Sequence, residues 1–389
     1  MRASSPFLMR IAFVTLPALS HLRLLAAVAK LVGVRRSDVC LVTGKSAKPI
    51  CERLALPFIL DGSLNIDFDR RSPSRLPFRQ QILSLDRFPI IVTAIRQILI
   101  DYGFDAVVTD CHFGVPVAGR SLGLPVGVVL NGPAWLLHPA QLFKSALEAE
   151  TQCLETVSRD FGVVIAGELA LSDILVEGCH TLCLGTIQMA EALGDNVRHS
   201  LPPERFIGFP PLSVIPARPL AHVSHDVLCS FGSLPAPEEL LIPVLERLLG
   251  LGFRIAVAGE YGFRMNGVNF LGWVDDLITL MRCSRVVVHH GGIATTLECL
   301  AAKRPALVLP LYETTDQPIN ARLIERLGAG YQSEHTSPWL SSVVADLLDS
   351  KELLRGAEYA GNQLVRATIR WHCDRWVRQL CRNRERQAH

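Results

Sequence analysis

The sequence has no strong excess of charge of either sign. Lys and Arg together number 39 and Asp and Glu 37, which leaves a formal net charge of +2 over 389 residues. A chain that binds nucleic acid through a basic surface usually carries a clear positive excess. The near balance therefore gives no reason to expect a nucleic acid or an acidic partner.

Metal-binding cysteine pairs and long apolar runs are also missing. The 11 cysteines are scattered with no C-x-x-C pair, and several lie inside apolar runs, where a reduced cysteine acts as a small hydrophobe. Carboxylates do not gather as a metal site would require, so no metal is expected. The apolar run from Ile11 is too short and interrupted for a signal peptide or a membrane span. Together these absences indicate a cytoplasmic protein.

Apolar strands that alternate with helices make up most of the chain. Hydrophobic residues are 49% of the sequence, enough for two cores. Runs of this kind are typical of parallel sheets covered on both faces, which bind ligands beyond the carboxyl ends of their strands. The predicted strands are Ile11–Thr15, Val39–Thr43, Ala106–Asp110, Val126–Leu130, Val227–Phe231, Arg254–Ala258, Val268–Leu271, Val286–Val288 and Ala306–Leu309.

Prolines concentrate between residues 202 and 219, which indicates a linker because proline fixes φ and removes a backbone donor. We therefore predict an N-terminal domain over 1–215 and a C-terminal domain over 216–360. Residues 361–389 follow as a basic segment with one apolar stripe at helical spacing, which ends in Trp376 and Leu380. Such a helix could pack back on the N-terminal domain or lie on an anionic membrane surface.

The most informative stretch begins with the strand Val286–Val288. The chain breaks at Gly291 and Gly292, where the backbone can turn tightly or admit a ligand, and a helix is then predicted to open at Thr295 and Thr296. The free N–H groups and the dipole of a helix start suit an anion, above all phosphate.

Two side chains flank this turn. His290 ends the strand and can donate to the same anion, and Glu298, one turn into the helix, could accept from ribose hydroxyls. The plain alternative is a strand–helix turn with two core histidines.

This stretch resembles the donor-binding signature of a glycosyltransferase superfamily that includes plant and bacterial UDP-sugar transferases, among them enzymes that modify natural products, macrolides and carotenoids. Members read His-Gly-Gly-x-Gly-Thr-Thr or His-Cys-Gly-Trp-Asn-Ser-Thr, then Glu, then Asp-Gln or Glu-Gln. Ala294 departs from the Gly or Asn usually found at its position. The matching residues are His290, Gly291, Gly292, Thr295, Thr296, Glu298, Asp316 and Gln317.

The resemblance implies an α/β protein of two facing doubly wound, Rossmann-like domains, the GT-B fold. It implies transfer of a glucose-type sugar from a UDP- or dTDP-sugar to a hydroxyl of a small-molecule acceptor, with inversion and without metal or cofactor. It leaves the acceptor and the oligomeric state open.

The same resemblance implies contacts with the diphosphate, the base and the sugar of the donor. Ser233, in a Phe-Gly-Ser turn, matches a loop that contacts the diphosphate. Trp273 would stack on the base, although the family's Trp-x-Pro-Gln is replaced here by Asp275 and Asp276. Asp316 and Gln317 would hold sugar hydroxyls, with helix capping by Asp316 as the alternative.

A His–Asp pair is predicted to supply the base. His21 follows the first strand and Asp110 closes a later one, so both could meet in one crevice. A carboxylate on one imidazole nitrogen lets the other nitrogen take a proton from an acceptor hydroxyl. In the resembling family a histidine in a Gly-His-x-x-Pro-like turn has this role, and here Ser20 and Leu24 replace the glycine and the proline. Alone, His21 would be a structural residue and Asp110 a helix cap.

Two other activities fit parts of this pattern. A nucleotide-sugar epimerase shares the two-lobed fold but needs acid and base groups over the sugar. A catalytically inactive auxiliary protein would keep the nucleotide site, and the departures at Ala294 and Asp276 are compatible with it.

Overall fold

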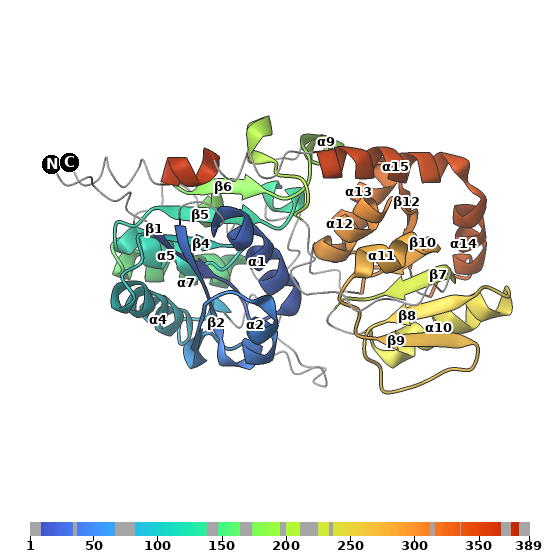
Figure 1. Cartoon of the computed structure of the whole chain (residues 1–389), viewed down its shortest axis with the longest axis horizontal. Coiled ribbons are helices and arrows are strands. Elements are labelled where there is room, and N and C mark those ends of the chain that lie inside the picture. The colour runs from blue at the N-terminus through green and yellow to red at the C-terminus, as the bar shows by residue number, and fades with distance from the viewer. Residues whose placement is uncertain are drawn as a thin grey trace.

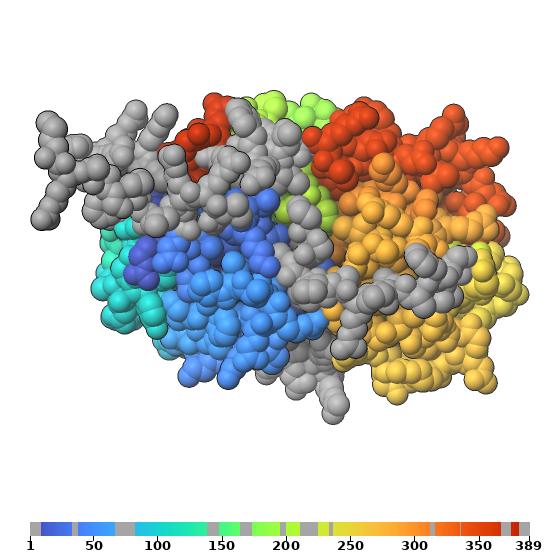
Figure 2. All heavy atoms as spheres, in the orientation of Figure 1, coloured from blue at the N-terminus to red at the C-terminus, as the bar shows by residue number. Residues whose placement is uncertain are grey.

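The computed structural model describes residues 9–33, 37–66, 82–137, 147–163, 173–194, 200–210, 225–232, 236–311, 316–334, 336–366 and 375–380. Within them the chain forms two α/β domains, each with a parallel sheet between helices (Figure 1). In the space-filling view the two domains form separate masses that meet along one boundary (Figure 2). The predicted fold of two facing doubly wound domains is confirmed.

The N-terminal sheet has the strand order β3-β2-β1-β4-β5-β6. The chain winds outward from β1 to β3 and then returns to β4 beside β1, so the winding direction changes between β1 and β4. Apart from the exposed Arg10, β1 is buried, as a central strand covered on both faces should be. The strands are β1 Met9–Val14, β2 Ser37–Gly44, β3 Phe58–Asp61, β4 Ala106–Thr109, β5 Val126–Leu130 and β6 His180–Cys183.

Helices and short 3-10 turns connect these strands. The first helix begins at Leu19, so His21 lies in its first turn. The helices are α1 Leu19–Gly33, α2 Lys48–Leu54, α4 Phe88–Asp101, α5 Gly114–Ser121, α7 Leu147–Asp160, α8 Asp173–Val176 and α9 Ile187–Ala192, with 3-10 turns at Lys45–Ala47, Gly62–Leu64, Pro133–Leu136 and Pro203–Arg205.

The C-terminal sheet repeats this plan in the order β12-β11-β10-β7-β8-β9, with its change of winding direction between β7 and β10. The predicted boundary near residue 215 falls between the sheets but outside the described residues. The strands are β7 His225–Ser230, β8 Ile255–Ala258, β9 Val268–Gly272, β10 Ser284–His289, β11 Ala306–Val308 and β12 Gly330–Gln332; the helices are α10 Glu238–Gly250, α11 Leu277–Arg282, α12 Ile293–Ala302, α13 Gln317–Arg326, α14 Leu340–Asp349 and α15 Lys351–Arg366.

The last described helical segment, residues 375–380, lies back on the N-terminal domain near β6 (Figure 1). Trp376 is 1% exposed, and its indole Nε1 donates to the carbonyl of His180 at 2.7 Å. Its ring lies so close to Gly127 that a Cβ there would be 2.5 Å from Cζ2. This contact is the one that the packing interpretation predicts, whereas the predicted boundary after residue 360 falls inside α15. Among the described residues, no helix has the length and hydrophobicity needed to cross a bilayer.

Candidate active site

His21 and Asp110 lie where the N-terminal sheet changes its winding direction. His21 follows β1 and Asp110 follows β4, which pairs with β1, so both stand beyond the carboxyl ends of adjacent strands. His21 Nδ1 lies 2.7 Å from Asp110 Oδ2. The other carboxylate oxygen accepts from the Thr15 hydroxyl at 2.7 Å, which fixes the buried Asp110. The two residues that sequence placed in one crevice are therefore in direct contact.

The surroundings of His21 favour its protonated form. Burial by itself would lower its pKa, but the charge and hydrogen bond of Asp110 and the charge of Asp316 outweigh burial, so the pKa is raised above 6.5. The Asn131 amide nitrogen also lies 3.3 Å from Nδ1. Because Nδ1 faces Asp110, a proton taken from a substrate would go to Nε2.

The backbone turns sharply just after Asp110. Cys111 has φ of +100°, a region that residues with a Cβ rarely adopt, and its side chain is fully buried. Such a conformation stores on the order of 1–3 kcal/mol and persists only where the surroundings enforce it. The turn allows the chain to leave β4 while the Asp110 carboxylate stays directed at α1.

In the C-terminal domain the equivalent change of direction carries the predicted phosphate turn. Gly291 has φ of +85°, and a Cβ on it would lie 2.7 Å from the Gln317 carbonyl oxygen. Gly292 has ordinary dihedral angles, but a Cβ there would lie 2.3 Å from His290 Nε2. Neither position therefore has room for a side chain. At Gly291 the reasons are its positive φ and the nearby Gln317 backbone, and at Gly292 the reason is the His290 ring.

The helix after this turn begins at Ile293, earlier than the predicted opening at Thr295 and Thr296. Thr295 therefore lies in the first turn and lines the pocket between the domains. The hydroxyl of Thr296 instead donates back to the Gly292 carbonyl at 3.1 Å, as threonines within helices often do. The expected contact of Thr296 with phosphate is therefore not supported, because its hydroxyl faces the helix.

Both histidines of the turn are neutral near pH 7. Burial lowers the pKa of His290 to about 4 and that of His289 to about 3. His289 Nδ1 accepts the Gly291 N–H at 3.1 Å, so His289 shapes the turn. His290 also hydrogen-bonds to the Ser230 backbone, and it would meet an anion as a neutral ring and not as a cation.

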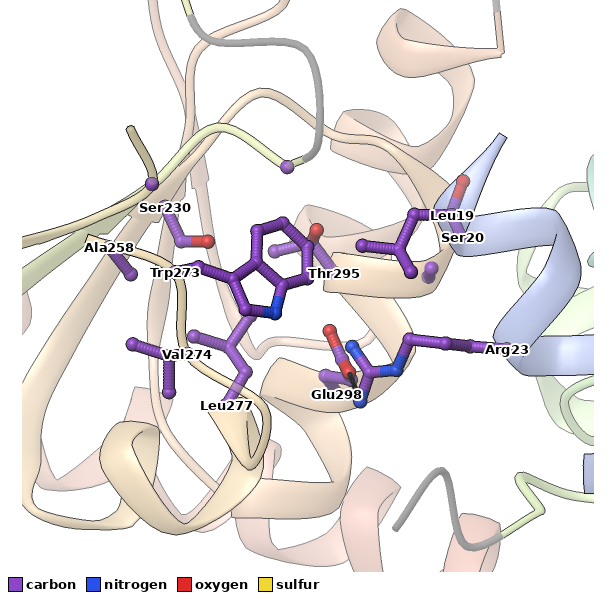
Figure 3. Close-up of a pocket in the computed structure, with 13 residues that line it drawn as sticks. Leu19, Ser20, Arg23, Ser230, Ala258, Trp273, Val274, Leu277, Thr295 and Glu298 are labelled. Carbon is purple, nitrogen blue, oxygen red and sulfur yellow. Dashed lines mark ion pairs between the residues drawn. The ribbon is translucent and has the colours of Figure 1, made fainter. Parts of the chain in front are cut away.

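The pocket beside this turn lies between the domains, with Trp273 at its centre (Figure 3). Glu298 is one of its lining residues. Ser230 and Gly232 also line it, whereas the predicted Ser233 lies outside the described residues. Its enclosed volume is about 60 Å³. Since ligand sites usually measure roughly 300–1,000 Å³, a nucleotide would also occupy the open cleft or displace lining side chains.

Glu298 already has an ion-pair partner within the protein. Its carboxylate lies 3.7 Å from Arg23 Nη2, and Arg23 comes from α1 of the other domain (Figure 3). Burial raises the pKa of Glu298 to about 7, although Arg23 opposes the shift. Among the described residues that line the pocket, Arg23 alone carries a positive side chain.

Asp316 and Gln317 begin α13 but face different surroundings. The Asp316 side chain does not cap the helix, and it accepts a hydrogen bond from Asn320 Nδ2 at 2.9 Å. The negative charge of Asp316 also helps to raise the pKa of His21 in the other domain. Gln317 Oε1 accepts the Leu311 N–H at 2.8 Å and helps to hold the backbone. Of the two, Asp316 is therefore better placed for a sugar lying between His21 and the phosphate turn.

Sequence reasoning missed Thr15, Arg23 and Asn131. Thr15 ends the first predicted strand, so its position at the carboxyl edge was a usable signal. Arg23 and Asn131 gave none, because they approach the site only through the packing of α1 and through the turn after β5.

Comparison with known proteins gives the same architecture. Residues 258–364 match the glycosyltransferase family 28 C-terminal domain. The elloramycin glycosyltransferase ElmGT of Streptomyces olivaceus is 40% identical over 93 residues, 24% of this chain and 21% of that protein. The matched stretches span between 15% and 35% of the curated relatives.

Solved structures resemble the whole chain. The glycosyltransferase SnogD from Streptomyces nogalater superposes with a TM-score of 0.68 at 19% identity, covering 96% of this chain and 99% of that one. Spinosyn rhamnosyltransferase SpnG complexed with thymidine diphosphate gives 0.71 at 17% identity, covering 96% and 100%. These solved glycosyltransferases share the fold of this chain, two facing doubly wound domains, the arrangement called GT-B.

The family 28 match within this GT-B chain contains every predicted donor residue except Ser233. His21 and Asp110 lie outside it. The candidate site therefore combines C-terminal residues that lie within the family match with N-terminal residues that lie outside it.

Proposed function

We propose that the chain transfers a sugar from a nucleotide-sugar to a hydroxyl of a small natural-product acceptor. The observation that carries this proposal is the His21–Asp110 pair, 2.7 Å apart, which stands across the domain boundary from the phosphate turn. A glycosyltransferase family match in the donor half supports it.

In this mechanism His21 Nε2 takes the proton of the acceptor hydroxyl while Asp110 stabilises the imidazolium that forms. The acceptor oxygen bonds to the anomeric carbon as the bond from that carbon to the diphosphate oxygen breaks. A single displacement of this kind inverts the anomeric centre. Asp316, whose charge helps to raise the pKa of His21, would accept hydrogen bonds from the hydroxyls of the transferred sugar.

The leaving diphosphate needs stabilisation of its negative charge. The N-terminus of α12 offers its first backbone N–H groups, at Gly292 and Ile293, and His290 lies beside them as a neutral ring whose single N–H is shared with the Ser230 backbone. Preorganised donors of this type can act without a metal ion. Transfer should therefore survive excess EDTA.

The proposed donors are UDP- and dTDP-sugars with a glucose-type sugar. Trp273 offers an indole face to a planar base. Thymidine diphosphate is the ligand named for SpnG, and elloramycin is named for ElmGT. These names support a pyrimidine nucleotide donor and a natural-product acceptor for this chain.

The test is transfer itself. Native protein is incubated with UDP-glucose or dTDP-glucose and a panel of phenolic acceptors, and hexose adducts are measured by mass spectrometry. Replacing His21 by Ala should reduce turnover by roughly 10²–10⁴-fold with little change in donor affinity, because the donor binds mainly to the other domain. A thiol acceptor, which needs less help from a base, should recover part of the rate.

A folded His21→Ala variant with native turnover on an alcohol would refute this mechanism. Incubation without acceptor separates transfer from isomerisation, since an epimerase would convert the nucleotide-sugar alone.

A further inference from the structure

Asp275 joins the two domains beside the donor pocket. Its Oδ1 accepts from Arg53 Nη2 at 2.6 Å and from Trp273 Nε1 at 3.0 Å. Its backbone carbonyl accepts from Arg23 Nη2 at 3.0 Å. Arg23 and Arg53 belong to α1 and α2 of the N-terminal domain, while Asp275 and Trp273 belong to the segment after β9. One acidic residue thus contacts two arginines of the opposite domain and the central aromatic residue of the pocket.

The segment 273–276 needs such contacts to hold its shape. It lies between β9 and α11 and belongs to neither, and it follows Gly272, whose φ is +65°. The neighbouring Asp276 is already engaged, because it caps α11 through the backbone N–H and hydroxyl of Thr279 at 3.0 and 2.6 Å. Asp275 is therefore the residue of this segment that fixes the Trp273 indole.

The orientation of that indole decides how much room a base has. Trp273 stands at the centre of the lining residues in Figure 3, and the enclosed space around it is only about 60 Å³. A platform already held in one orientation binds a base with less loss of side-chain entropy than a free one. A contact that fixes Trp273 should consequently be visible in nucleotide affinity.

We propose that Arg53 is a positioning residue for the nucleotide: through Asp275 it holds the Trp273 platform from the opposite domain, with Arg23 fixing the backbone beside it. The inference rests on the proposed function, since it takes a nucleotide as the ligand. It also gives separate roles to the two aspartates that stand in place of the Pro-Gln of the Trp-x-Pro-Gln motif. Asp276 caps a helix, and Asp275 links the base platform to the acceptor-side domain.

The expected effect is moderate. The Arg53 side chain is 46% exposed, while that of Asp275 is 14% exposed, so solvent and salt partly screen their attraction. An exposed ion pair changes an equilibrium by roughly two- to fivefold. Asp275→Ala, which also removes the indole's acceptor, should have a larger effect, about tenfold.

The experiment measures the affinities of UDP and dTDP by calorimetry for the native protein, Arg53→Ala, Arg53→Lys, Asp275→Asn and the double variant Arg53→Ala/Asp275→Asn. Asp275→Asn keeps an oxygen that can accept from the indole but loses the charge. The singles should each weaken binding about two- to fivefold, Arg53→Lys should restore part of it, and the double should be no weaker than the worse single. The deficit of Arg53→Ala should shrink in about 0.5 M salt.

Arg254→Ala is the matched control. It removes an arginine–aspartate pair of the same kind, with Asp226, at the opposite end of the C-terminal strands, and it should leave nucleotide affinity unchanged. With an active donor and acceptor, Arg53→Ala should raise the KM for the donor and leave kcat near the native value.

Each other outcome counts against the inference. If Arg53→Ala binds nucleotide as tightly as the native protein, or more tightly, Arg53 does not position the platform. Additive losses in the double variant would show that the two residues act separately. If the native protein binds neither nucleotide, the proposed function fails first and this inference fails with it.

Discussion

At the scale of single residues, the environment of His21 decides at which pH the proposed base works. Asp110 accepts from Nδ1 and raises the pKa of the imidazole above its ordinary value, against the effect of burial. A base must be unprotonated to act, so a raised pKa moves the lower limit of activity to higher pH. The contact with Asp110 that orients the imidazole ring therefore also narrows the pH range in which His21 can act as a base.

This argument predicts a shift in the pH profile. The rate of the native protein should rise with pH through a value above 6.5. In Asp110→Asn the charge that raises the pKa is lost while burial remains, so the rise should occur at lower pH, and the plateau rate should fall because an amide stabilises the imidazolium less well. The measurement is kcat against pH for both proteins. A profile of Asp110→Asn at the same or higher pH would contradict the assignment.

Glu298 gives a second residue-scale prediction, this time for stability. Its folded pKa is raised from 4.5 to about 7, so the folded state prefers the protonated acid. The stability that this preference contributes is present below pH 4.5 and is lost as pH rises through 7. Glu298→Gln has no such loss, so its stability relative to native should increase between pH 4.5 and 7, by up to about 3 kcal/mol. Urea unfolding at several pH values checks this, and parallel curves would refute it.

At the scale of elements, the turn between β10 and α12 depends on two glycines for different reasons. Gly291 needs a left-handed backbone beside the Gln317 carbonyl, and Gly292 leaves space for His290. The turn sets where the helix starts, and hence where its free N–H groups point.

Alanine at either glycine should therefore damage the site and the fold together. Gly291→Ala should lower stability by about 1–3 kcal/mol and weaken nucleotide binding, because a Cβ forces the turn away from Gln317. Gly292→Ala should displace His290 and weaken nucleotide binding more than it lowers stability. Gly250→Ala is the control, since nothing lies within 4 Å of a Cβ there. Thermal unfolding and calorimetry measure both effects, and native-like behaviour of Gly291→Ala would show that the turn adapts.

At the scale of the whole molecule, two features connect the domains. The chain crosses back after α15, so that residues 375–380 cover the N-terminal domain (Figure 1). Beside the pocket, Arg23 contacts Glu298 and the Asp275 carbonyl, and Arg53 contacts the Asp275 carboxylate. The first feature fastens the C-terminal segment to the domain that holds His21, and the second makes the pocket a product of both domains.

The return of the chain can be tested at Trp376. Trp376→Ala should lower stability by roughly 3–5 kcal/mol, because it removes a large buried side chain and leaves the His180 carbonyl without its donor. Trp339→Ala should change stability little, because that side chain is 71% exposed. Thermal unfolding compares them. Equal stability of the two variants would mean that residues 375–380 add nothing to the N-terminal domain.

The sequence by itself determined the features that depend on neighbouring residues. Buried strands such as β5 and β10 appear as apolar runs, and the turn from His290 to Gly292 carries its own glycines. The sequence also placed His21 and Asp110 in one crevice, because both follow predicted strands and parallel strands end at a common edge of the sheet.

Only the tertiary structure decided the rest. The strands β3, β6 and β12 are short and contain polar residues or glycine, so they lack the continuous apolar run that revealed strands of similar length such as β11. The direction of the Thr296 hydroxyl depends on where α12 starts, which follows from the turn before it. Arg23 meets Glu298, and Arg53 meets Asp275, only because two separately folded domains come together. No local pattern encodes such contacts, since the partners are more than 200 residues apart and their distance is fixed by how the domains pack.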